Sequence, residues 1–230
     1  MYKATLFALL LLSSMVAGSA SARAPDTFEE AYIAPVEIDS PMWFAFELKL
    51  GPYQPKYPAF KSTFDDDRGW LLDTEVDFTL YRIPYVGQLN VGIGWGWANY
   101  QAKSIVLPGD ERLGENTEFT IYPMSGLAVL RIDALARYTV IPLTFAAKIG
   151  YQAVRYKITK GSETADDGIN HGIRWGAQVA LELDVIDRKA TRRLDDDFGI
   201  NHTFLLFEFF GSETESTGAR AFQFGLGLQF

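Results

Sequence analysis

The stretch that decides the fold is Ala221-Phe222-Gln223-Phe224-Gly225-Leu226-Gly227-Leu228-Gln229-Phe230. Successive side chains of a β-strand point to opposite faces, so one face of this stretch is wholly apolar and the other carries alanine, glutamine and glycine. Alternation without exception predicts a strand, and this length is that of a tilted strand that crosses a lipid bilayer. The face expected to meet lipid consists of Phe222, Phe224, Leu226, Leu228 and Phe230.

A soluble sandwich could also end on such a strand, but it would leave an apolar edge open to aggregation. A closed barrel has no free edge, because its first and last strands pair with each other. The alternation therefore favours a barrel in lipid over an edge strand in water.

The same alternation recurs along the chain and predicts eight strands. The clearest internal example is 88–100, where large apolar side chains alternate with glycine, alanine and asparagine. The weakest is 118–133, where Pro123 predicts a bend or a bulge. The expected strands are 43–51, 70–82, 88–100, 118–133, 142–158, 171–183, 201–211 and 221–230.

The connections between these strands alternate in length. Those after the first, third, fifth and seventh strands are long and polar, at 52–69, 101–117, 159–170 and 212–218. The connection after the sixth strand contains a predicted short helix at 187–194, capped by Asp187. Long and short connections alternate in this way in transmembrane barrels, and only closed barrels satisfy every backbone group of a strand in lipid. The expected fold is all-β: an eight-stranded antiparallel up-and-down transmembrane β-barrel with one short periplasmic helix.

The N-terminus predicts export. Lys3, an apolar run from Leu6 and the small residues before Ala22 are typical of a cleaved secretory signal peptide. The cleavage site is expected after Ala22, with Ala20 as the alternative. The expected organisation is thus a signal peptide at 1–22, a periplasmic lead-in at 23–42 and the barrel at 43–230.

Composition narrows the function classes. The net charge is −8, and removal of 1–22, whose only charged side chain is Lys3, leaves −9. An acidic chain is a poor partner for nucleic acid, since phosphate binding needs clustered lysine and arginine. The chain has no cysteine, which excludes disulfides, thiolate metal sites and cysteine nucleophiles. No cofactor is expected.

Charged residues fall on the inward face of several expected strands. A barrel of eight strands encloses a space that side chains nearly fill, and unpaired charge buried there is costly. We therefore predict a salt-bridge network in the lumen, centred on Arg174, Lys148 and Lys49. Its expected members are Glu47, Lys49, Asp73, Glu75, Asp77, Lys148, Arg174, Glu182 and Glu208.

Aromatic side chains are expected to form belts where the outer face of the barrel meets the membrane interfaces. The candidates are Trp43, Trp70, Trp95, Trp97, Tyr100, Tyr151 and Trp175.

Two sharper functions compete with a structural or surface-interaction role. A lipid A-modifying enzyme would need a histidine base beside a nucleophile. Ser162 and Asp166 could approach His171 from a loop, whereas His202 is expected at the opposite, periplasmic end. Spacing alone supplies no catalytic constellation, so the prediction is that the chain is not an enzyme.

A narrow transporter of small or hydrophobic molecules is the other alternative. It would need an apolar cavity, and the only hint of one is the inward parity of Phe204, Leu206 and Phe210. Side chains that simply fill a tapered barrel explain this pattern more economically.

Several segments resemble a group of small outer-membrane β-barrel proteins common in myxobacteria and their relatives. The resembling segments are 46–53, 122–124 with 130–133, 141–143 with 147–150, and 199–203 leading to 207–208. The C-terminal stretch likewise resembles the signal that the barrel-assembly machinery reads in bacterial outer-membrane proteins. The resemblance implies this fold in the outer membrane of a Gram-negative cell, and no established activity. The expected partners are outer-membrane lipids, lipopolysaccharide and the assembly machinery, and a monomer is expected.

Overall fold

The computed structural model describes residues 42–56, 60, 64, 69–105, 112–186, 188–215 and 217–230. The predicted signal peptide and, except for Met42, the predicted lead-in lie outside the described residues. Within the described part, no helix is both long enough and apolar enough to cross a membrane.

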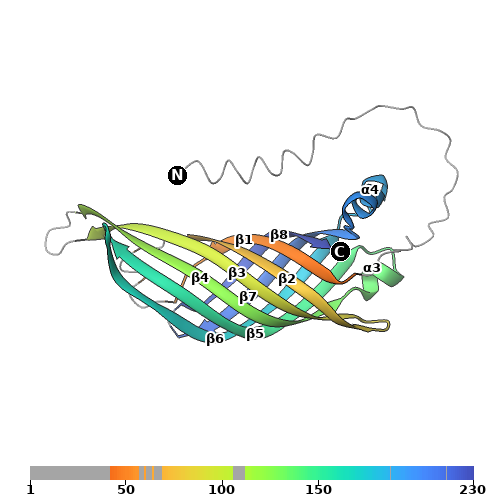
Figure 1. Ribbon diagram of the computed structural model, residues 1–230, viewed down its shortest axis with the longest axis horizontal. Helices are drawn as coiled ribbons and strands as arrows, with labels where there is room; N and C mark the ends of the chain where they lie inside the picture. Colours follow the sequence, from red (N-terminus) through yellow and green to blue (C-terminus); the bar gives the residue numbers. More distant parts are fainter. Residues whose placement is uncertain are drawn as a thin grey trace, which may run out of the picture. The chain divides into compact units, whose positions relative to one another are not determined.

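Eight antiparallel strands, each paired with its neighbours in sequence, close into a barrel when β1 pairs with β8 (Figure 1). The predicted fold class is confirmed. The strands are β1 (Phe44–Tyr53), β2 (Gly69–Ile83), β3 (Gly87–Ile105), β4 (Arg112–Ile132), β5 (Leu143–Lys160), β6 (Glu163–Glu182), β7 (His202–Thr214) and β8 (Ala219–Gln229).

The two ends of the barrel differ in their connections. One end, here called the terminal end, carries the start of β1, the end of β8, the tight turn between β2 and β3, and two helices. The helix α4 (Arg188–Phe198) lies in the predicted connection after β6 and is followed by Gly199 at a positive φ of 69°. The short helix α3 (Ala134–Tyr138), after β4, was not predicted. The opposite end is here called the loop end.

At the loop end, the structure differs from the prediction for two of the long loops. The segment expected as a loop at 159–170 consists mostly of paired β-strand. β5 and β6 stay hydrogen-bonded to each other up to Lys160 and Glu163 and are joined by a two-residue turn. Much of the loop expected at 101–117 is also strand, since β3 and β4 remain paired out to Ile105 and Arg112. A strand with polar side chains on both faces loses its apolar alternation but keeps its backbone hydrogen bonds, so sequence periodicity ends before the strand does.

Strand β4 keeps its register across Pro123, so the bulge allowed by the sequence is absent there. Its alternation is weak because its inward side chains include Phe119, Ile121, Leu127 and Val129, which are buried and apolar. Apolar residues on both faces remove the contrast on which a period-two pattern depends.

The outward face carries most of the large exposed apolar side chains. All of the predicted C-terminal face except Leu228 and Phe230 is more than a third exposed, with Phe224 at 58%. One predicted belt aromatic is misplaced: Tyr100 faces the lumen, is 2% exposed, and donates a hydrogen bond to the carbonyl of Tyr53. Successive side chains of a strand alternate between its two faces, so the even-numbered Tyr100 points to the face away from that of the odd-numbered Trp95 and Trp97, which face outward.

Candidate functional site

Two lysines and three glutamates form the centre of the lumen. Lys49 Nζ lies 2.6 Å from Glu75 Oε2 and 2.5 Å from Glu208 Oε2. Lys148 Nζ lies 2.7 Å from Glu47 Oε2, 2.8 Å from Glu75 Oε1 and 3.3 Å from Glu208 Oε2. One oxygen of each glutamate lies within 4.8 Å of those of the other two, a spacing made tolerable by the two ammonium groups between them. Each cation therefore serves several carboxylates.

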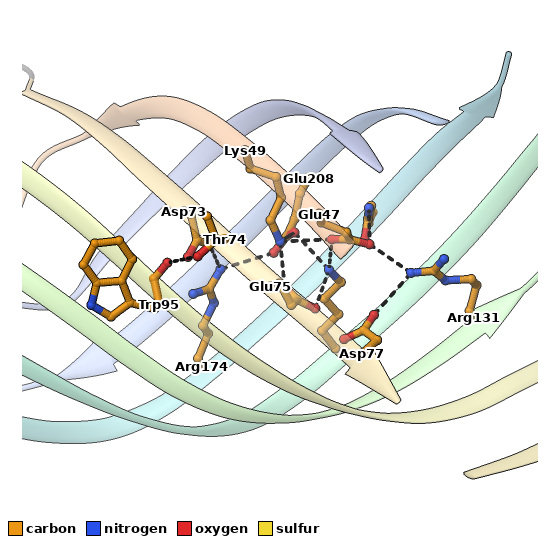
Figure 2. Close-up of polar contacts among 12 residues, drawn as sticks. Glu47, Lys49, Asp73, Thr74, Glu75, Asp77, Trp95, Arg131, Arg174 and Glu208 are labelled. Carbon is orange, nitrogen blue, oxygen red and sulfur yellow. Dashed lines mark hydrogen bonds and ion pairs between the residues drawn. The ribbon is translucent and has the colours of Figure 1, made fainter. Parts of the chain in front are cut away.

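Two arginines extend this cluster in opposite directions (Figure 2). Arg174 Nη2 lies 2.5 Å from Asp73 Oδ2 and 3.6 Å from Glu208 Oε1. Arg131 Nη2 lies 2.9 Å from Glu47 Oε1 and 3.2 Å from Asp77 Oδ2. The nine members, hereafter the ionic cluster, are Glu47, Lys49, Asp73, Glu75, Asp77, Arg131, Lys148, Arg174 and Glu208, none more than 6% exposed.

The ionic cluster is close to electroneutral. Its five carboxylates face four cations, and Gln178 adds a hydrogen bond from Nε2 to Glu47 Oε1 at 3.1 Å. A buried charge without a partner would be unstable, whereas a shared network offsets much of the desolvation cost. The lumen can hold this many ions because nearly every one has a counter-charge.

Glycines on neighbouring strands make room for the cluster. Asp77, Glu75 and Asp73 of β2 lie directly across from Gly92, Gly94 and Gly96 of β3. In the same way Lys148 faces Gly176, Arg174 faces Gly150, and Lys49 and Glu47 face Gly225 and Gly227. A Cβ at Gly92 would lie 2.4 Å from Asp77 Oδ1, and one at Gly176 would lie 2.9 Å from Glu208 Oε1. Gly92 and Gly176 therefore leave space for charged side chains of the neighbouring strands.

An aromatic layer fills the lumen between the ionic cluster and the loop end. Phe60 and Phe64, from the connection between β1 and β2, pack against the rings of Tyr100 and Phe119 at 5.0–6.4 Å between centroids. Arg174 lies 4.8 Å from the ring centroid of Phe210 and so joins this layer to the ionic cluster. The layer contains Tyr53, Phe60, Phe64, Leu71, Ala98, Tyr100, Phe119, Ile121, Val154, Phe210, Ala219 and Ala221.

Glu182 is the one predicted network residue that the structure places elsewhere. It lies at the terminal end, where Glu182 Oε1 and Asp184 Oδ2 are each 2.7 Å from His202 Nδ1. Asp184 lies beyond the end of β6, and its Oδ1 also accepts a hydrogen bond from the Thr203 amide. Burial raises the pKa of the Asp184 carboxyl, while the hydrogen bond with His202 opposes that rise. This rim cluster ties the end of β6 to the start of β7.

The sequence analysis did not identify Arg131 as a member of the ionic cluster, nor Phe60 and Phe64 as members of the aromatic layer. Arg131 lies on β4, whose weak alternation hid which residues face inward. A usable signal was present: the inward acids on the expected strands outnumber the bases, so a further cation was needed. Phe60 and Phe64 lie in a connection, where no periodicity indicates direction.

The structure separates the residues considered for catalysis. His171 is exposed on the outward face of β6, with its ring 5.8 Å from that of Tyr151. Asp166 is five residues away along the same strand, about 16 Å at roughly 3.3 Å per residue, and has the opposite parity. Ser162, in the turn, is farther still. The approach of Ser162 and Asp166 to His171 that the sequence left open does not occur, because it required a loop where β6 is extended.

The inward apolar side chains of β7 pack in the core of the barrel and fill space there. Phe204 and Leu206 are 3% exposed and pack with Ala180, and Phe210 is fully buried in the aromatic layer. Arg131 lies 5.9 Å from the ring centroid of Phe204. Apolar side chains thus lie on both sides of the ionic cluster.

The comparisons with known proteins concern architecture. No protein-family model and no curated protein matches the chain. Among solved structures, Ail, the attachment invasion locus protein of Yersinia pestis, is 10% identical, with a TM-score of 0.47 over 82% of this chain and 99% of that chain. Neisserial surface protein A is 11% identical, with a TM-score of 0.46 over 81% of this chain and 97% of that chain.

The N-terminal β-barrel domain of Pseudomonas aeruginosa OprF is 11% identical, with a TM-score of 0.41 over 81% of this chain and 97% of that chain. Likeness at this level carries no argument about location, ligand or activity. The resemblance to the myxobacterial group stays a prediction. The architecture itself is established by the strand pairing: the chain is a closed, eight-stranded, up-and-down β-barrel with a filled lumen.

Proposed function

We propose that the chain is an integral outer-membrane β-barrel protein with a structural or surface-interaction role, and that it conducts nothing through its lumen. One observation carries this proposal: the barrel is apolar outside and ionic inside. Large apolar side chains are exposed on the outward faces of all eight strands, and the charges of the ionic cluster are buried. This is the reverse of a water-soluble barrel and is what lipid requires.

The length of the apolar surface supports a single crossing per strand. On β5, outward side chains are apolar from Leu143 to Ala153, and the next outward positions are Arg155 and Lys157. That apolar span is close to the 9–11 residues of a tilted membrane-crossing strand. We assign the terminal end to the periplasm and the loop end to the cell exterior, because transmembrane barrels place short turns and chain ends on the periplasmic side.

The filled lumen supports the absence of conduction. Ion passage would have to break the salt bridges of Lys49 and Lys148 and displace the aromatic layer. We also propose that the chain is monomeric, that a signal peptide at 1–22 directs its export, and that the assembly machinery reads the C-terminal face that includes Phe222, Phe224 and Leu226. Their outward exposure supports the last of these.

The test is to express the full chain in a Gram-negative host and extract it from outer membranes in detergent. The folded barrel should migrate differently on a gel before and after boiling, and should leave planar bilayers non-conducting. N-terminal sequencing should begin at residue 23 or 21. A chain recovered without detergent would overturn the membrane assignment, and stable single-channel currents would overturn the closed lumen.

A further inference from the structure

The outward face of β3, β4 and β5 carries two hollows that meet at Met124. The first, of about 400 Å³, is lined by Ile93, Gly94, Trp95, Met124, Ser125, Gly126, Tyr151 and Ala153. Gly126 forms part of its floor: a Cβ added there would meet no atom within 4 Å. Missing side-chain volume on a surface otherwise covered by large side chains creates an apolar trough, here called the acyl groove.

The second hollow, of about 340 Å³, lies on the loop-end side of the acyl groove and is lined by Tyr122, Met124, Arg155 and Lys157. Register places Tyr122 beside Arg155 and Met124 beside Ala153. Arg155 and Lys157 are alternate residues on one face of β5, so their backbones lie about 7 Å apart. These four residues are here called the cationic step.

The charges of the cationic step are available for a ligand. Within the described ranges, neither Arg155 nor Lys157 forms a salt bridge. Asp167 is the cross-strand neighbour of Lys157 on β6, yet no ion pair joins them. By contrast, Arg220, an outward cation of β8, lies 3.3 Å from Glu213 Oε1. Two unpaired cations directly above an apolar trough suit an anionic headgroup with attached acyl chains.

We propose that the acyl groove and the cationic step together bind one phosphorylated glycolipid of the lipid A type. A phosphate would lie between Arg155 and Lys157, Tyr122 would hydrogen-bond at the interface, and an acyl chain would lie against Gly126 between Trp95 and Tyr151. The proposal rests on the proposed outer-membrane orientation, which puts the cationic step in the outer leaflet. The outer leaflet presents phosphorylated, multiply acylated glycolipid, which matches both charge and shape.

The experiment uses the full chain extracted in detergent, with diphosphoryl lipid A as the probe and native mass spectrometry as the readout. Wild type should retain one lipid A, and the double variant Arg155→Gln/Lys157→Gln should bind it at least tenfold more weakly. Gly126→Leu should weaken binding as well, because it fills the acyl groove while leaving every charge in place. Arg220→Gln, which removes a paired outward cation, is the matched control and should bind as wild type does.

Competition identifies the ligand chemistry. Lipid A stripped of both phosphates should bind more weakly than the diphosphoryl form, and inorganic phosphate should not displace the lipid. Undiminished binding in the double variant, or an equal loss in Arg220→Gln, would overturn the site. Displacement by phosphatidylglycerol at equal concentration would overturn the choice of glycolipid. If wild type itself gives no heat-modifiable barrel, the proposed function has failed, which is distinguishable from a folded barrel that ignores lipid A.

Discussion

Lys148 lies within 3.3 Å of carboxylates from β1, β2 and β7. Its ammonium is a counter-charge shared by Glu47, Glu75 and Glu208, so its removal leaves several buried negative charges under-compensated. Deleting one partner of a buried ion pair costs much more than the pair itself contributes, because the orphaned charge remains desolvated. At the scale of one residue, the lumen is stable only when its charges are present together.

Lys148→Met should therefore lower the free energy of unfolding by about 3–5 kcal/mol. Urea titration of the barrel in lipid vesicles measures this difference. Lys160→Met, at the exposed end of the same strand, is the control and should change stability by less than about 0.5 kcal/mol. Equal stability of the two variants would mean that the ionic cluster contributes little.

Gly92→Ala should destabilise the barrel by about 1–3 kcal/mol, because the added methyl group would force Asp77 away from its position beside Arg131. Gly126→Ala provides the comparison, since it adds the same methyl group to open space on the outer face. Thermal unfolding monitored by gel shift measures both variants. Equal melting temperatures for Gly92→Ala and Gly126→Ala would show that Gly92 is not required to leave space for Asp77.

At the scale of elements, the hairpin of β5 and β6 shows where the sequence was informative and where it was not. Strong contrast between the two faces located the central parts of the strands and gave the inward parity of Asp73, Glu75 and Asp77. Toward the loop end both faces of this hairpin carry polar side chains, so the contrast disappears while the hydrogen-bonded ladder continues to Lys160 and Glu163. Arg131 was not predicted as an inward residue for the opposite reason: β4 carries apolar side chains on both faces, so its inward face could not be recognised.

The extension of this hairpin predicts slow amide exchange in a segment that looks like a loop. The amides of 155–160, which pair with both β4 and β6, and the alternate amides of 163–169 that point toward β5 should exchange with deuterium far more slowly than the same peptides after unfolding, because these amides are held in backbone hydrogen bonds. Mass spectrometry of the detergent-extracted barrel measures this. Exchange as fast as in the unfolded chain would show that the ladder stops near Ala153.

On the scale of the whole molecule, the barrel closes at the pairing of β1 with β8. Trp43 and Phe44 donate backbone hydrogen bonds to the carbonyl of Phe230, at 2.7 and 3.3 Å. The rings of Phe44 and Phe230 stack at 4.7 Å between centroids. The first and last residues of the sheet are thus held together by backbone and side chain at the terminal end.

Phe230→Ala should weaken this closure by about 2 kcal/mol, through loss of the ring stack and of apolar burial. The fraction of chain that runs as the unboiled, folded form in outer-membrane extracts should fall relative to wild type. Phe198→Ala, at the exposed end of α4, should leave that fraction unchanged. A folded fraction equal to wild type in Phe230→Ala would separate the terminal aromatic from barrel closure.

The distribution of the ionic cluster over the chain bears on how the barrel can form. Its members come from β1, β2, β4, β5, β6 and β7, and Lys49 reaches Glu208 across the position of β8. An unclosed sheet cannot give all of them their counter-charges, so they must stay hydrated until the first and last strands meet. Water would then leave the interior as the ring is completed, which makes closure of the barrel and drying of its lumen a single event.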